Sequence, residues 1–251
     1  DIKPGDVAGE SVVVIKNDPK LPYAGNLSFD SYGSRGTGRY QASATASADN
    51  IFGMNDFLTV THKESWPHNA HNQNSDSDSI FFSVPYGSTN FSAGYSVSEY
   101  ESRIITPGNV ILPLEGDSNN AFVKFDYNIW RSQLSKLNLS STLTRKDSQN
   151  YAAGQLLQVS SRVLTVADFD MDYSTQALGG FVNLNTGLAI GTKISNALDD
   201  NPGLPGRAPR AQFKKFKFGG GYTLPFEALE RQATFSSQLT GQFAFDTLYG
   251  S

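Results

Sequence analysis

The segment from Val163 to Tyr173 reads VLTVADFDMDY, and its regular alternation of apolar and acidic residues decides the fold class. Residues i and i+2 of a β-strand point to the same side, so this strand has two unlike faces. One face carries Val163, Thr165, Ala167, Phe169, Met171 and Tyr173, and the other carries Asp168, Asp170 and Asp172. Such a strand fits a soluble β-sandwich, with the apolar face buried, or a membrane β-barrel, with that face against lipid.

The same alternation recurs along the chain in eleven strand-length segments. They cover residues 26–30, 40–48, 58–61, 80–84, 91–98, 123–129, 137–144, 163–173, 182–190, 215–224 and 234–245. Short connections lie at residues 49–55, 86–88, 132–135, 176–179 and 227–231, and long ones at 66–78, 103–118, 151–161 and 194–211. Transmembrane barrels have short turns on one side of the membrane and long loops on the other. We therefore predict an all-β fold, an antiparallel transmembrane β-barrel whose strands form an up-and-down meander.

The composition narrows the function classes. Charged residues make up 18% of the 251 residues, below the ~25% of soluble domains. No apolar run reaches the ~18–20 residues of a membrane helix, whereas a barrel spreads its apolar residues over every second position. The net charge of −4 speaks against a nucleic-acid partner, and the absence of cysteine excludes disulfides, thiolate metal sites and cysteine nucleophiles.

Catalytic and metal-binding motifs are weak in this sequence. His62, His68 and His71 fall near a predicted long loop together with Asp76 and Asp78. The spacing of His68 and His71 suits a metal ion only on a helix or a tight turn, and the surrounding polar residues favour a solvated loop instead. No Gly-x-Ser-x-Gly nucleophile elbow occurs. We expect no enzyme activity, no metal site and no cofactor.

Several short motifs, spread in order through nearly the whole chain, resemble one family of membrane proteins. They are Pro4-Gly5 with Gly9-Glu10-Ser11 ahead of residues 12–15, the run 32–39, Asp49-Asn50 with Gly53 and Asn55-Asp56, the runs 83–87 and 94–100, and residues 207–213. The sequence is similar to two-partner secretion transporters, the exporters of haemolysins, filamentous haemagglutinins and contact-dependent-inhibition proteins within the wider BamA-like superfamily.

The resemblance implies a Gram-negative outer-membrane transporter that secretes a partner exoprotein, a haemolysin, adhesin or toxin, through its pore. It also implies that residues 1–23 are a linker from an upstream POTRA domain. Residues 24–251 would then be the N-terminal part of the barrel, the first ~11 of about 16 strands. The implied partners are the secreted exoprotein, outer-membrane lipid and lipopolysaccharide, and the rest of the same transporter, namely its POTRA domains and C-terminal strands.

The polar face of barrel strands lines the lumen. The residues that we expect to face it are Lys124, Asp126, Asp168, Asp170, Asp172, Lys215 and Lys217. They form either a wall that interacts with a plug, a loop or an unfolded exoprotein, or a hydrated wall whose charges pair across strands. The sequence leaves both interpretations open.

Two other functions share parts of this pattern. A general diffusion porin has the same alternating strands, but it predicts a self-contained barrel without a linker at its start. A soluble β-sandwich adhesin module would pack its apolar faces together and bury Phe125, Phe169 and Phe218 between two sheets.

Overall fold

The structure is a computed structural model that describes residues 2–4, 10–13, 21–34, 36–66, 73–228 and 231–249. Within them nearly all regular structure is β-strand, and the only helical element is the short 3-10 turn η1 (Ile194–Asn196). In the same residues, no helix has the length and apolar character that a membrane crossing requires. The fold is all-β, as predicted.

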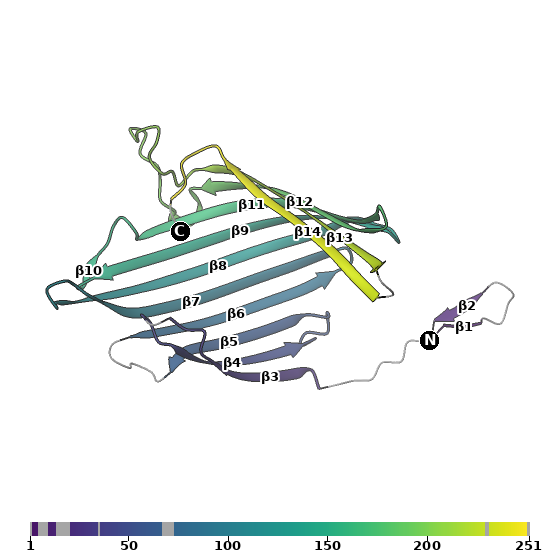
Figure 1. The fold of residues 1–251 in the computed structure, drawn as a ribbon, viewed down its shortest axis with the longest axis horizontal. Helices are drawn as coiled ribbons and strands as arrows, with labels where there is room; N and C mark the ends of the chain where they lie inside the picture. Colours follow the sequence, from purple (N-terminus) through teal and green to yellow (C-terminus); the bar gives the residue numbers. More distant parts are fainter. Residues whose placement is uncertain are drawn as a thin grey trace.

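One curved antiparallel sheet dominates the molecule (Figure 1). Eleven strands form it in sequence order, each paired with the next of the eleven, while the short β10 (Gln155–Leu156) pairs only with β9. The eleven are β3 (Tyr23–Asp30), β4 (Tyr40–Asp49), β5 (Phe57–Trp66), β6 (Asn74–Tyr86), β7 (Thr89–Ile105), β8 (Ile111–Arg131), β9 (Ser135–Ala152), β11 (Arg162–Ala177), β12 (Gly180–Thr192), β13 (Lys214–Ala228) and β14 (Arg231–Ala244). The predicted strands and their up-and-down order are confirmed.

Two short strands near the N-terminus stand apart from this sheet. β1 (Ile2–Pro4) and β2 (Ser11–Val13) pair with each other in an antiparallel two-stranded sheet. Both fall in the predicted linker, residues 1–23, and neither pairs with a strand of the large sheet. The division into linker and barrel stays a prediction.

The apolar face of the large sheet is uncovered. Phe125, Phe169 and Phe218 are 38%, 51% and 43% exposed, and in the described part of the chain only Ala189 and Ala211 are buried apolar residues. A soluble domain of this size would hold a continuous core, because burying one large apolar side chain is worth about 1.5–3 kcal/mol. The β-sandwich alternative is therefore wrong.

The three longest strands of the sheet are neighbours. β7, β8 and β9 contain 17, 21 and 18 residues, while β4 and β5 contain 10 each. A tilted strand crosses a bilayer in about 9–11 residues, so these three have residues to spare at one end. The prediction of a long loop at residues 103–118 is wrong, because β7 and β8 continue as a paired hairpin to Ile105 and Ile111.

Of the other three predicted long loops, one is shorter than predicted, one contains a small hairpin and one is confirmed. The loop predicted at residues 66–78 is shorter than expected, because β6 begins at Asn74. The loop at 151–161 contains the small hairpin of β9 and β10, whereas residues 194–211 are a long loop, as predicted. The misjudged segments lack a period of two although their backbones continue to pair. Residues 74–78 are polar on both faces, and residues 104–105 and 110–112 are apolar in succession.

The short connections lie together at the other end of the sheet. The turns at residues 87–88, 132–134 and 178–179 join their strands directly, and residues 50–56 join β4 to β5. Gly87 and Gly179 take positive φ angles of 59° and 77°, which glycine adopts without steric cost. These short turns are confirmed, while the turn near residue 229 includes residues outside the described part of the chain.

Candidate functional site: the charged face of the sheet

The strand register brings the seven predicted lumen residues to one face of the sheet. Directly paired residues of neighbouring strands point to the same side. One row of such partners is Lys124, Thr142, Asp168, Ala189 and Lys215. The adjacent row on the same face is Asp126, Ser140, Asp170, Gly187 and Lys217. The third row contains Asn138, Asp172, Asn185 and Gly219.

Ion pairs connect the charges on this face. Lys217 Nζ lies 2.6 Å from Asp168 Oδ1 and 3.0 Å from Asp170 Oδ1, so one ammonium group on β13 binds two carboxylates on β11. Lys124 Nζ lies 2.9 Å from Asp126 Oδ1 within β8. These side chains are 20–38% exposed, which places them at a hydrated surface and not in a dry interior.

Small residues on β12, the strand between β11 and β13, allow the Lys217 side chain to cross to the aspartates of β11. Between Asp170 and Lys217 stands Gly187, and between Asp168 and Lys215 stands Ala189. A β-carbon at Gly187 would overlap the Asp170 carboxylate and would lie 3.1 Å from Lys217 Cε. The glycine therefore keeps open the space in which the lysine and the aspartate meet.

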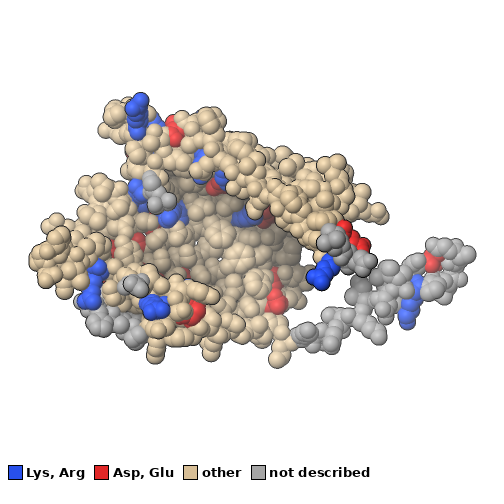
Figure 2. Space-filling view, viewed as in Figure 1, with Lys and Arg blue, Asp and Glu red and all other residues tan. Residues whose placement is uncertain are grey.

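The charged face is the concave side of the sheet. A hollow on it is lined by Lys124, Asp170, Asp172 and Lys217 together with uncharged residues, most of them polar or glycine. Figure 2 looks into the concave side and shows basic and acidic side chains along its wall. Asp172 lines this hollow, and Lys215 shares the face through its register position. The arrangement offers charges and hydrogen-bonding groups to a polar medium.

Aromatic residues interrupt the polar face at β5, β6 and β8. The sequence analysis did not predict this cluster. Phe81 lies 6.3 Å from Phe57 and 6.3 Å from Phe122, measured between ring centroids. Phe122 covers Gly94 on β7, where a β-carbon would overlap its ring. Only the register reveals this cluster, because Phe81 stands between Ile80 and Phe82 in a run without alternation.

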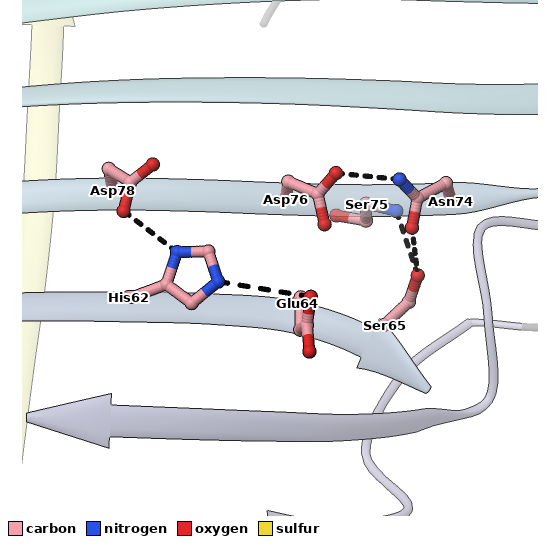
Figure 3. Close-up of polar contacts among 7 residues, drawn as sticks. All are labelled: His62, Glu64, Ser65, Asn74, Ser75, Asp76 and Asp78. Atoms are coloured by element: carbon pink, nitrogen blue, oxygen red, sulfur yellow. Dashed lines mark hydrogen bonds and ion pairs between the residues drawn. The ribbon is translucent and has the colours of Figure 1, made fainter. Parts of the chain in front are cut away.

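The histidine group has a different setting from the predicted loop. His62 lies within β5, and its Nδ1 is 2.8 Å from Asp78 Oδ1 on β6, while Nε2 is 3.9 Å from Glu64 (Figure 3). The loop prediction is wrong for His62, because the strand continues to Trp66. His68 and His71 lie outside the described residues. Within the described part of the chain, no three His, Cys, Asp or Glu residues are grouped to hold a metal ion.

A polar network fastens the same end of β5 to the start of β6 (Figure 3). Ser65 is fully buried, donates to Asn74 Oδ1 and accepts a hydrogen bond from the Ser75 backbone N–H at 3.0 Å. Asn74 Nδ2 in turn donates to Asp76 Oδ2 at 2.6 Å. These bonds satisfy buried polar groups where the hairpin turns back, so the network explains the local structure without a ligand.

The fold and this face together define a class: a wall of a membrane β-barrel, apolar outside and polar inside. The model of the family "haemolysin secretion/activation protein ShlB/FhaC/HecB" matches residues 9–251. The chain belongs to that family. This confirms the family predicted from the sequence motifs, and the diffusion-porin alternative is set aside because it requires a different family.

Individual relatives agree with the family match. The outer membrane transporter CdiB of Dickeya dadantii (strain 3937) is 29% identical over 253 residues, covering 100% of this chain and 44% of that protein. The hemolysin transporter protein ShlB of Serratia marcescens is 32% identical over 191 residues, covering 76% of this chain and 34% of that protein. The chain therefore spans about half the length of the curated relatives or less.

Solved structures confirm the fold class. CdiB from Escherichia coli superposes with a TM-score of 0.87 at 27% identity, covering 99% of this chain and 45% of that structure. CdiB from Acinetobacter baumannii shares the fold with a TM-score of 0.64 at 16% identity. The predicted location in the Gram-negative outer membrane is confirmed by the family and by this fold.

Proposed function

We propose that the whole protein, of which this chain forms a part, secretes a partner exoprotein across the outer membrane through its barrel. The observation that supports this proposal most strongly is the family match over residues 9–251 of a chain that folds as the wall of a β-barrel. The relatives named CdiB and ShlB are an outer membrane transporter and a hemolysin transporter, which supports a haemolysin, adhesin or toxin as the exported class. The proposal includes no enzyme activity and no cofactor.

The uncovered apolar face contacts the hydrocarbon of the membrane in this proposal. Along β8 this face is apolar from Trp130 to Ala121, about the length of one bilayer crossing. Phe91 and Phe125 pack on it with ring centroids 5.0 Å apart. Beyond Ala121 the same face carries Asn119 and Asp117, which suits the headgroup region of the lipopolysaccharide leaflet.

The charged face lines the route of the exoprotein in this proposal. An unfolded chain exposes backbone N–H and C=O groups, and a wall of hydrated polar side chains offers them hydrogen bonds without a large apolar surface. The partial exposure of Lys217, Asp168 and Asp170 supports contact with water. The charges of this wall would act on the passing chain or on ions, and their mutual pairing would keep them in place.

The two edge strands of the sheet and residues 1–23 indicate the remaining partners, which are further parts of the same transporter. β3 and β14 each have one neighbour among the described strands, and lipid does not tolerate an unpaired edge. The C-terminal strands of the same transporter would close the ring, and residues 1–23 would connect it to a POTRA domain. Both statements are proposals that rest on the family.

The test is deletion and restoration of the gene that encodes the full transporter, with the exoprotein measured outside the cell. We expect extracellular exoprotein to disappear on deletion and to return with the restored gene, while other outer-membrane proteins stay at normal levels. Exoprotein that still reaches the medium after deletion would contradict the proposal. A deletion that instead slows the uptake of small solutes would favour a porin.

A further inference from the structure

We propose that the turn at residues 50–56 anchors the barrel in the inner leaflet of the outer membrane through Ile51, Phe52 and Met54. The turn joins β4 to β5 at the end of the sheet that carries the short turns. Asn119 and Asp117, which the proposed function places at the lipopolysaccharide leaflet, lie toward the other end of the sheet, so this end faces the periplasm. The proposed ligand is the acyl region of phospholipid. The inference rests on the proposed contact between the apolar face and lipid.

A buried carboxylate holds this turn in one conformation. Asp56 is 1% exposed, and its carboxylate accepts backbone hydrogen bonds from Ile51 and Phe52 at 3.0 Å each and from Met54 at 3.4 Å. Asn50 accepts a further bond through Oδ1 from the Asn55 N–H at 2.8 Å. Charge-assisted bonds to backbone N–H groups are among the stronger protein hydrogen bonds, so the turn is held by its own polar atoms.

The backbone of the turn is built for this shape. Asn50, Gly53 and Asn55 have φ angles of 57°, 74° and 56°. Only glycine and, less readily, asparagine and aspartate adopt such angles at low cost. The sequence therefore assigns permissive residues to the bends and apolar residues to the positions between them.

The turn therefore has its polar atoms inside and its apolar side chains outside, the reverse of what is usual for a turn that faces water. Ile51, Phe52 and Met54 are 43%, 65% and 53% exposed. The turn's only charged side chain, Asp56, is the buried one. A rigid loop that presents three apolar side chains and no exposed charge fits the acyl boundary of a membrane better than water.

The turn leans toward the lipid side of the sheet. The Phe52 ring lies 6.0 Å from the Phe82 ring in an edge-to-face arrangement. Phe82 belongs to the row that pairs Leu58, Ala93 and Val123, all on the apolar face. The exposed side chains of the turn are thus continuous with the surface proposed to face hydrocarbon, and this continuity selects lipid over a protein partner as the occupant.

The same turn touches the point where the chain enters the barrel. The Asp49 backbone N–H donates to the Pro22 carbonyl at 2.7 Å, so the start of β3 is bonded to the end of β4 beside the turn. Tyr23 pairs with Ala48 on the apolar face and is 69% exposed. An anchored turn would therefore fix the depth at which residues 1–23 leave the membrane surface.

The experiment uses single cysteines in the full transporter, with any cysteine outside this cysteine-free chain replaced by serine. The variants Phe52→Cys, Phe125→Cys and Ser88→Cys each receive an environment-sensitive fluorophore. They are reconstituted into phosphatidylethanolamine–phosphatidylglycerol vesicles. Phe125 is the control in the middle of the apolar face, and Ser88 is an exposed residue of the polar turn at 87–88.

We expect nitroxide-labelled lipid to quench the probes at positions 52 and 125 and aqueous iodide to quench the probe at position 88. Addition of Asp56→Ala should shift the position-52 probe toward iodide quenching, because the turn loses its clamp, while the position-125 probe keeps its lipid quenching. Iodide quenching at position 52 alone would overturn the anchor and leave the proposed function standing. Protection from both quenchers would overturn it in favour of a protein partner, and loss of lipid quenching at position 125 would contradict the lipid-facing wall itself.

Discussion

Neighbouring residues of β11 lie in two different environments. Phe169 belongs to an apolar row with Leu188 and Phe216, whereas Asp170, the next residue, belongs to a row with Gly187 and Lys217. The backbone of the strand is the same for both, so the medium on each side determines which side chains fit. The comparison teaches that the two faces of this sheet differ from one residue to the next, while the described residues form almost no buried apolar core.

The largest effect should come from a charge on the apolar face. We expect Phe169→Arg to lower the free energy of unfolding of the full transporter in vesicles by about 2–4 kcal/mol, because Arg near the bilayer midplane loses its hydration. Denaturant titration of folded protein measures this change. The matched control is Ser140→Arg on the charged face, between Asp126 and Asp170, where we expect almost no change. Equal losses for both variants would show that the two faces do not differ.

A smaller effect should follow when the space on the charged face is filled. We expect Gly187→Ala to cost about 1–3 kcal/mol, because the new β-carbon would overlap the Asp170 carboxylate. Gly206→Ala, in the long loop with nothing within 4 Å of the added atom, is the control and should be neutral. The same titration measures both variants, and a neutral Gly187→Ala would mean that the cross-strand contact does not constrain β12.

Removal of the bridging cation should have the smallest effect on stability. Lys217→Met leaves Asp168 and Asp170 without their shared lysine, and we expect a loss of at most about 1 kcal/mol, since hydrated ion pairs contribute little. Lys193→Met, which removes the exposed pair with Asp199 in the long loop, provides the scale of a surface pair. A loss of about 3–5 kcal/mol at Lys217 would instead indicate a dry site and contradict a water-filled lumen.

Charge reversal sharpens the comparison through ion selectivity, a measurement that does not depend on stability. We expect the combined replacement of Asp168, Asp170 and Asp172 by lysine to shift the ion selectivity of the reconstituted full transporter from cations toward anions, because a charged wall attracts counter-ions. Planar-bilayer reversal potentials measure the shift, and extracellular exoprotein measures the effect on export. Unchanged selectivity together with unchanged export would leave these aspartates a purely structural role.

The eleven strands and their two faces could be predicted from the sequence because a strand has a period of two. In β11 and β13 every residue from Ala167 to Tyr173 and from Lys215 to Phe218 follows that alternation. The alternation specifies which side chains share a face, and the charged face followed directly from it. Family motifs then added the class of protein, which alternation alone could not distinguish from a porin.

The contacts within the site could not be predicted, because they depend on register. The sequence places Lys217 on the correct face but does not indicate that it reaches Asp168 and Asp170 across Gly187. The paired hairpin that β7 and β8 form up to Ile105 and Ile111 was missed for another reason. Residues near Glu99 and Asp117 are polar, and residues 104–105 and 110–112 are apolar in succession, so the pairing continues without an alternation to reveal it.

The turn at residues 50–56, with its buried Asp56 carboxylate, could be predicted in part. Its motif, from Asp49 to Asp56, was visible in the sequence as a family feature. The sequence did not show that the Asp56 carboxylate is buried beneath three backbone N–H groups, because that requires the positive φ angles of the turn. Turn chemistry can thus identify a bend without showing which side chains the bend exposes.

The most direct test of the two-faced wall is nitroxide scanning of β11 in the full transporter reconstituted into vesicles. Single labels from Ala167 to Asp172 would be read for collisions with oxygen, which concentrates in hydrocarbon, and with a water-soluble nickel chelate. We predict oxygen contact at positions 167, 169 and 171 and chelate contact at 168, 170 and 172. Equal access of the chelate to both sets of positions would contradict the account.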